Sequence, residues 1–100
     1  MKSQFEEICQ EDCKQFRDLF SRYKSKRVED LEELHSISTL ALILAQRWCE
    51  IQSNASIIAK ENGLSKTDFQ QWAYQHYRNL QEMHIDCARE DLKANLIMEN

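Results

Sequence analysis

Four cysteines and three histidines are the side chains in this sequence that bind metal ions most readily. Cys9 and Cys13 lie four residues apart, which is the spacing of two ligands on one face of a helix. Cys49 and His76 are the residues that could complete such a site if the chain folds up, down and up again. However, Cys9 and Cys13 stand among aromatic and aliphatic residues, where a cysteine is ordinarily a small buried hydrophobic residue. We therefore expect packing rather than a metal site, and no cofactor.

His35 offers a second kind of chemistry, because an exposed histidine on a helix can accept a phosphoryl group. Glu33, Leu34 and His35, followed by an apolar helix, resemble the histidine-phosphotransfer and kinase-dimerisation helices over a short segment. The resemblance implies a helical phosphotransfer protein with His35 as the phosphoacceptor. In this chain no acidic residue follows His35 directly and no proline is present, so we expect an ordinary solvated histidine.

Other enzymatic signatures are missing from the sequence. It has no glycine-rich phosphate loop, no nucleophile elbow and no HExxH motif. The acidic pairs at residues 6–7 and 32–33 belong to faces that we expect to be solvated, away from the burial that activates a catalytic carboxylate. We predict that the protein is not an enzyme.

The segment from Lys14 to Arg27 is basic and has aromatic residues interleaved with the charges. This pattern is typical of nucleic-acid contacts, in which basic side chains bind phosphates and rings stack on bases. Phe16, Phe20 and Tyr23 share a helical face that we expect to be buried, so they are not free to stack. We keep a nucleic-acid-binding transcriptional, plasmid or phage regulator as the alternative function. Its contacts would come from Lys14, Arg17, Arg22, Lys24, Lys26 and Arg27.

Acidic residues follow this basic segment at once. They complement the N-terminal dipole of the next helix, and they also present negative charge to a partner. The formal net charge of −4 favours a protein partner over nucleic acid or an anionic membrane. Tyr74 projects from a different helical face and is a further candidate contact, because aromatic side chains with a polar group are favoured at interfaces. The predicted partner-binding residues are Glu29, Asp30, Glu32, Glu33 and Tyr74.

A chain of 100 residues can bury one hydrophobic core, so we expect a single helical domain over residues 1–100. The first residues lack the apolar stretch of a signal peptide, and the longest apolar run is too short for a membrane span. Four cysteines in such a chain are expected to be reduced thiols. We therefore expect a cytoplasmic protein that does not contact a membrane.

The elements that carry these residues are predicted to be helices, because the chain has no proline and its one glycine is Gly63. Gly63 marks a helix end, and Ser65 with Asp68 marks the next helix start. The change from basic to acidic residues places another bend at about Ser25 to Val28. We predict an all-α antiparallel bundle of three long helices, at about residues 4–25, 29–62 and 66–98.

The middle helix carries two apolar faces. The broad face consists of Leu34, Ile37, Leu40, Ala41, Leu44, Ala45, Trp48, Ile51, Ala55, Ile58 and Ala59. The minor stripe consists of Leu42, Ile43, Cys49 and Ile57. A three-helix monomer buries the broad face but has no neighbour for the minor stripe, so we predict a homodimer that forms through this stripe. The alternative is a compact four-helix monomer in which the middle helix is interrupted near residues 52–54.

These observations together predict a small acidic protein-binding module that works as a dimer. We expect it to act as an inhibitor, adaptor, chaperone or regulator by masking a basic surface of another protein.

Overall fold

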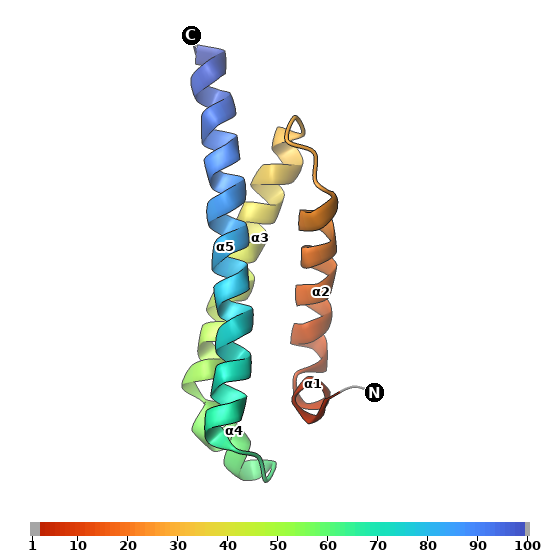
Figure 1. Cartoon of the computed structure of the whole chain (residues 1–100), viewed down its shortest axis with the longest axis vertical. Helices are drawn as coiled ribbons and strands as arrows, with labels where there is room; N and C mark the ends of the chain where they lie inside the picture. Colours follow the sequence, from red (N-terminus) through yellow and green to blue (C-terminus); the bar gives the residue numbers. More distant parts are fainter. Residues whose placement is uncertain (1–2, 100) are drawn as a thin grey trace.

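The computed structural model describes residues 3–99, except for the side chains of Asn95 and of residues 97–99. Figure 1 shows α2, α3 and α5 running up, down and up, which confirms the predicted antiparallel helical arrangement. The molecule measures 57 × 25 × 15 Å between Cα atoms. No helix in the described range has the length and apolar character needed to cross a membrane. The helices are α1 (Gln4–Ile8), α2 (Gln10–Ser25), α3 (Leu31–Ser53), α4 (Ala55–Glu61) and α5 (Lys66–Glu99).

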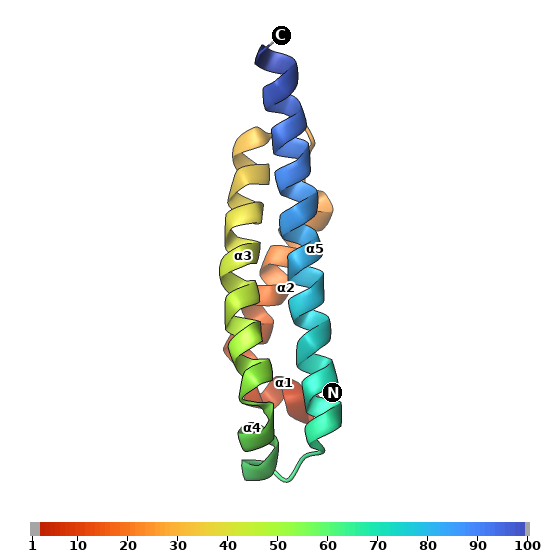
Figure 2. The same ribbon diagram turned by 90° about the vertical axis from the view of Figure 1, so that its left-hand side faces the viewer.

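The main helix pair is α3 with α5, which lie side by side along most of their length in Figure 2. A polar contact joins them, because the Nδ1 atom of His84 lies 2.9 Å from the carbonyl oxygen of Ser38. A carbonyl oxygen only accepts, so Nδ1 carries the proton. The Oγ atom of Ser38 lies 2.9 Å from the same nitrogen. In Figure 2, α2 lies behind this pair, so one face of the pair is covered by α2 and the opposite face is not.

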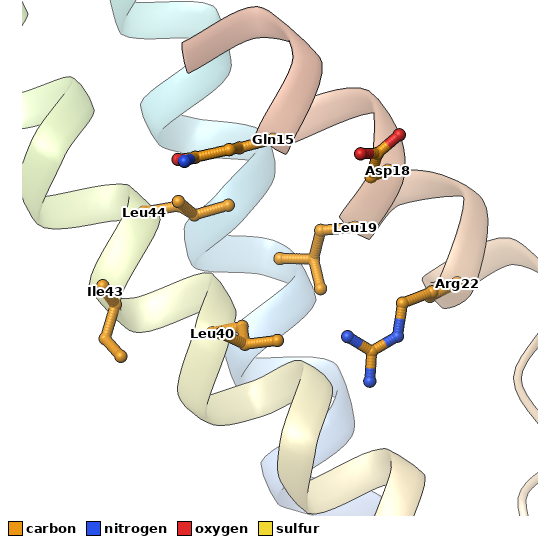
Figure 3. Close-up of a pocket in the computed structure, with 7 residues that line it drawn as sticks. All are labelled: Gln15, Asp18, Leu19, Arg22, Leu40, Ile43 and Leu44. Atoms are coloured by element: carbon orange, nitrogen blue, oxygen red, sulfur yellow. The ribbon is translucent and has the colours of Figure 1, made fainter. Parts of the chain in front are cut away.

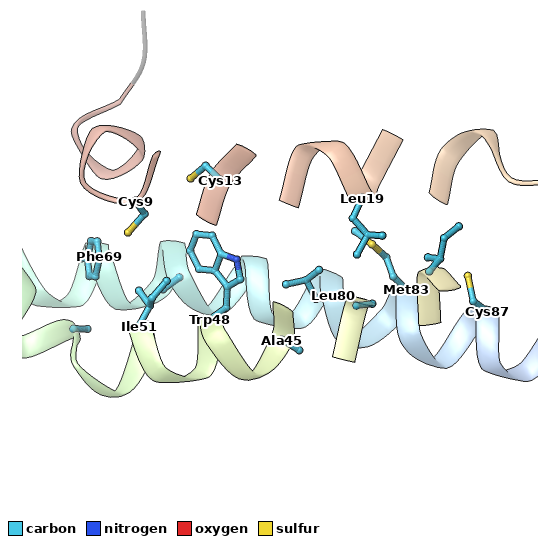
Figure 4. Close-up of a cluster of buried hydrophobic side chains, with 14 of the residues drawn as sticks. Cys9, Cys13, Leu19, Ala45, Trp48, Ile51, Phe69, Leu80, Met83 and Cys87 are labelled. Atoms are coloured by element: carbon cyan, nitrogen blue, oxygen red, sulfur yellow. The ribbon is translucent and has the colours of Figure 1, made fainter. Parts of the chain in front are cut away.

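The core runs along the space between α2, α3 and α5 (Figure 4). Trp48 is fully buried, and its ring stacks on that of His76 with centroids 4.2 Å apart. Leu40 was predicted to be buried with the rest of the broad face, but 36% of its surface is exposed. The buried hydrophobic residues are Cys9, Cys13, Leu19, Leu34, Ile37, Ala41, Ala45, Trp48, Ile51, Ala55, Ala59, Phe69, Ala73, Leu80, Met83 and Cys87.

The predicted bend after the basic segment is confirmed, because α2 ends at Ser25 and α3 begins at Leu31. Asp30 caps α3, and its carboxylate accepts a hydrogen bond of 3.1 Å from the backbone N–H of Glu33. This bond satisfies a donor that has no partner within the helix. The middle helix therefore starts slightly later than predicted.

Gly63 and Ser65 also act as predicted. Gly63 has φ of +65°, and the N–H of Leu64 donates to the carbonyl oxygen of Ala59 at 2.8 Å. Together these features form a glycine-capped helix end. Ser65 starts α5, because its Oγ accepts a hydrogen bond of 3.3 Å from the N–H of Asp68.

Two interruptions show that the predicted unbroken helices 4–25 and 29–62 were wrong. At Asn54, between α3 and α4, the side chains of Ser53 and Asn54 donate to the carbonyl oxygens of Cys49 and Glu50, each at 3.0 Å. Such side chains compete with the helical backbone pattern. The position agrees with the interruption that the sequence allowed near residues 52–54.

The interruption at Cys9, between α1 and α2, was not expected. The φ and ψ angles of Cys9 are −114° and 45°, which end the helical path of α1. The ring of Phe5 then packs against the rings of Phe69 and Trp72, at 5.5 and 5.3 Å between centroids. The change of direction at Cys9 therefore depends on contacts with α5, which is distant in the sequence.

Candidate protein-binding site

A groove of about 380 Å³ lies between α2 and α3. Its apolar surface comes from Leu19 of α2 and from leucine and isoleucine side chains of α3 (Figure 3). Leu40 is 36% exposed and Ile43 is 55% exposed, although both are large aliphatic residues. We call this feature the α2–α3 groove. It is lined by Gln15, Asp18, Leu19, Arg22, Leu40, Ile43 and Leu44.

Two arginines tie α2 to α3 at the ends of this groove. At one end, Arg22 forms an ion pair with Glu33 and donates to the Oγ of Ser36 at 3.0 Å. At the other end, the Nε of Arg47 donates to Asp12 at 3.1 Å. The hydrogen bond to Asp12 raises the pKa of Arg47. Between these two ends the groove is open, and it is lined there by Gln15, Asp18, Leu19, Leu40, Ile43 and Leu44.

The charge around the groove is more acidic than basic. Arg47 is shared between Asp12 and Glu50, the latter at 3.5 Å, so carboxylates outnumber guanidinium groups at this end. Asp18 lines the middle of the groove and forms no ion pair with any described residue. The end near Arg22 adjoins a polar hollow lined by Asp30, Glu32 and Glu33. Three basic residues of residues 14–27 form no ion pair with a described carboxylate: Lys14, four residues before Asp18, Lys24 near the end of α2, and Arg27 in the α2–α3 loop.

The predicted acidic residues therefore divide into two kinds. Asp30 caps α3 and Glu33 binds Arg22, so these two have structural roles. Glu29 and Glu32 are exposed and make no ion pair with the described part of the chain. Tyr74 is 43% exposed on α5 and lies outside this cluster, with its ring 6.4 Å from that of Tyr77.

The basic segment is largely engaged within the molecule. Arg17 pairs with Glu6 at 3.7 Å, and Lys26 pairs with Asp86 at 3.8 Å. Lys24 lies over the ring of Phe20, with its Nζ 5.1 Å from the centroid.

The aromatic residues of this segment are engaged as well. Phe16, Phe20 and Tyr23 pack against the hydrophobic core, as the sequence predicts. The hydroxyl of Tyr23 donates to Asp86 at 2.6 Å, and this hydrogen bond raises the pKa of Tyr23 to about 12. No surface of free rings and free basic side chains results.

The candidate metal ligands do not converge. Cys9 and Cys13 are buried, and burial raises the pKa of both thiols, that of Cys13 to about 11. Cys49 is exposed on α3. The Nδ1 of His76 lies 2.8 Å from the carbonyl oxygen of Trp72, to which it donates. Among the side chains that the structure describes, no three of His, Cys, Asp or Glu form a group that could hold a metal ion.

His35, the candidate phosphoacceptor, is exposed near the beginning of α3. No hydrogen bond or ion pair orients its ring within the described structure. The geometry adds no activating neighbour to this histidine.

The residues of the minor stripe are all exposed, but they do not share one face. Leu42 is 42% exposed, Ile43 55% and Ile57 59%, and Cys49 is also exposed. Ile43 lines the α2–α3 groove, whereas Leu42 and Cys49 do not. The groove was not predicted from the sequence, although Leu40, Ile43 and Leu44 have the i, i+3, i+4 spacing of one helical edge.

Comparisons of the chain with protein families, with curated proteins and with solved structures gave no match. The surfaces of the molecule are therefore the basis for a functional proposal.

Proposed function

We propose that the protein is a binding module without catalytic activity, and that it takes up a basic amphipathic segment of another protein in the α2–α3 groove. The observation that carries this proposal is the exposed aliphatic surface of Leu40 and Ile43 between two acidic ends. Such a module can serve as an inhibitor, adaptor, chaperone or regulator of its partner.

The groove suits such a segment for two physical reasons. An aliphatic side chain placed against Leu40 and Ile43 removes apolar surface from water, which stabilises the complex by about 25 cal/mol per Å². Lysine or arginine residues next to it would meet the carboxylates of Asp18, Glu29 and Glu32, which form no ion pair with any described residue. Complementary charge of this kind mainly speeds association and makes it sensitive to salt.

The proposal includes the dimer that the sequence predicts. Leu42 and Cys49 are exposed in a single copy and lie outside the groove. A second copy can therefore be added without closing the groove to a partner.

A synthetic helical peptide of leucine and lysine tests the groove by isothermal titration calorimetry. We expect binding that weakens as salt increases. Ile43→Glu should weaken binding by about 10-fold or more, because it places a charge on the apolar floor. The double variant Glu29→Lys with Glu32→Lys should also weaken binding, and it leaves the cap of Asp30 and the ion pair of Glu33 intact.

Glu61→Lys is the matched control, because Glu61 is an exposed acid on α4, away from the groove. If Glu61→Lys weakens binding as much as the Glu29 and Glu32 changes, or if a leucine–glutamate peptide binds equally well, the proposed site is wrong.

A further inference from the structure

A strip of exposed residues on α3 carries no formal charge. Its residues are spaced alternately by four and three, which is the period of a helical packing seam. Leu42 is 42% exposed at its centre. Charged residues make up 30% of the chain, so an exposed strip without charge along five turns of one helix is consistent with a surface that packs against another molecule. We call this strip the neutral seam, and it consists of His35, Thr39, Leu42, Gln46, Cys49 and Ser53.

The neutral seam lies on the face of α3 that α2 does not cover. Ser38 contacts α5 through its hydrogen bonds with His84. At about 100° per residue, Leu42 and Cys49 lie within about 40° of Ser38 around the helix. Arg47, which binds Asp12 of α2, lies about 180° from Ser38.

α5 contributes exposed side chains to the same face. Tyr74, Ile85 and Leu92 are 43%, 48% and 60% exposed, and they lie about 80–100° from His84 around α5. His76, which packs against Phe16 of α2 at 4.7 Å between centroids, lies about 80° to the other side of His84. Figure 2 views this face, with α3 and α5 in front and α2 behind. The neutral seam and these residues of α5 thus form one uncovered face.

Two arguments identify the occupant of this face as a second copy of the chain. At 1.5 Å per residue the neutral seam is about 27 Å long, and the molecule is 15 Å across its shortest axis between Cα atoms, so the face comes within about a factor of two of the ~800 Å² that each partner contributes to a standard interface. Copies of a chain with a net charge of −4 repel one another in general, but two neutral seams bring no like charges together. A basic partner, by contrast, gains no ion pair on the neutral seam.

We propose that two copies associate through this face, with the neutral seam of α3 at its centre and Tyr74, Ile85 and Leu92 beside it. The inference rests on the self-association in the proposed function and refines it, because Ile43 of the predicted stripe lies in the α2–α3 groove and outside the interface. The α2–α3 grooves then remain open on the outer sides of the dimer.

Molar mass from light scattering tests this interface. We expect the wild-type protein to have twice the mass of the 11.9 kDa chain. Leu42→Glu should raise the dissociation constant of the dimer by about 10-fold or more, because it buries an unpaired charge. Ile43→Glu is the matched control, since it places the same charge on the next residue but in the groove, and its mass should equal that of the wild type.

Modification of Cys49 by an aromatic disulfide reagent gives a second readout. Cys9, Cys13 and Cys87 are buried, so the fast reaction reports on Cys49. Its rate should fall as the concentration of wild-type protein rises and should stay constant for Leu42→Glu. A wild-type mass of one chain at every concentration, or a dimer that Ile43→Glu dissociates and Leu42→Glu does not, would overturn the inference.

These outcomes are separable from those of the groove. Leu42→Glu should still bind the leucine–lysine peptide, and Ile43→Glu should still form the dimer. A wild-type protein that is monomeric but binds the peptide therefore contradicts only the interface, and a wild-type dimer that does not bind the peptide contradicts only the groove.

Discussion

His76 is a titratable residue whose ring lies among aromatic rings of α2, α3 and α5. Its ring packs against three aromatic rings, those of Phe16, Trp48 and Trp72, with centroids 4.7, 4.2 and 4.7 Å away. Burial lowers its pKa from the usual 6.5, although the carbonyl of Trp72 and the charge of Glu6 act in the opposite direction. The folded protein therefore favours the neutral imidazole.

This environment predicts an acid-sensitive fold. Because the pKa is lower in the folded than in the unfolded chain, the unfolded chain holds more protons between the two values, and stability falls as pH drops below about 6.5. Chemical denaturation at several pH values should show that His76→Phe loses less unfolding free energy on acidification than the wild type. His35→Gln, at an exposed position, should keep the wild-type slope. Equal slopes for the wild type and His76→Phe would contradict this explanation.

At the scale of the elements, local caps define most helix ends. Asp30 and Ser65 accept hydrogen bonds at the starts of α3 and α5, and Gly63 closes the end of α4 in a left-handed conformation. A Cβ atom at Gly63 would meet no heavy atom within 4 Å. The cost of a side chain there comes from the backbone conformation alone.

Gly63→Ala is accordingly expected to lower the unfolding free energy by about 1–2 kcal/mol, measured by urea denaturation. Gly63→Asn should lower it less, because asparagine tolerates the left-handed region better than alanine. If alanine is tolerated as well as asparagine, the helix end must adjust rather than hold the positive φ.

At the scale of the whole molecule, the arrangement of charges bears on the choice between protein and nucleic acid as a partner. Arg17, Arg22 and Lys26 each pair with a carboxylate, so half of the basic segment is neutralised internally. The net charge of −4 opposes binding to a polyanion at long range. Both observations favour the protein partner.

A gel-shift experiment at low salt tests this choice. We expect the wild-type protein to leave duplex DNA and RNA unshifted at micromolar concentrations. A shift that disappears in Lys14→Ala and Arg27→Ala, and that persists in the control Lys60→Ala on α4, would instead support the nucleic-acid-binding regulator.

Much of the fold could be predicted from the sequence, because helices depend on local patterns. The lack of proline, the single glycine and the spacing of apolar residues predict three antiparallel helices, and the burial of Leu34, Trp48 and Leu80 follows from that spacing. The interruption at Cys9 could not be predicted, since it depends on Phe5 meeting Phe69 and Trp72 on a distant helix.

The candidate site was only partly predictable. The exposure of Leu42 and Ile43 follows from their position outside the broad face, but their separation onto two surfaces depends on where α2 lies against α3. In the same way, the sequence shows a basic segment followed by an acidic one, but not which of these charges meet.

By itself, the sequence determined the helical class, the bend after Ser25 and the helix boundary at Gly63, because caps, glycine and apolar periodicity act between residues close in the chain. Only the tertiary structure decided the pairing of Arg22 with Glu33 and of Lys26 with Asp86, the groove around Ile43 and the face of α3 and α5 that α2 does not cover. These features depend on the distances and rotations between helices, which no local pattern specifies.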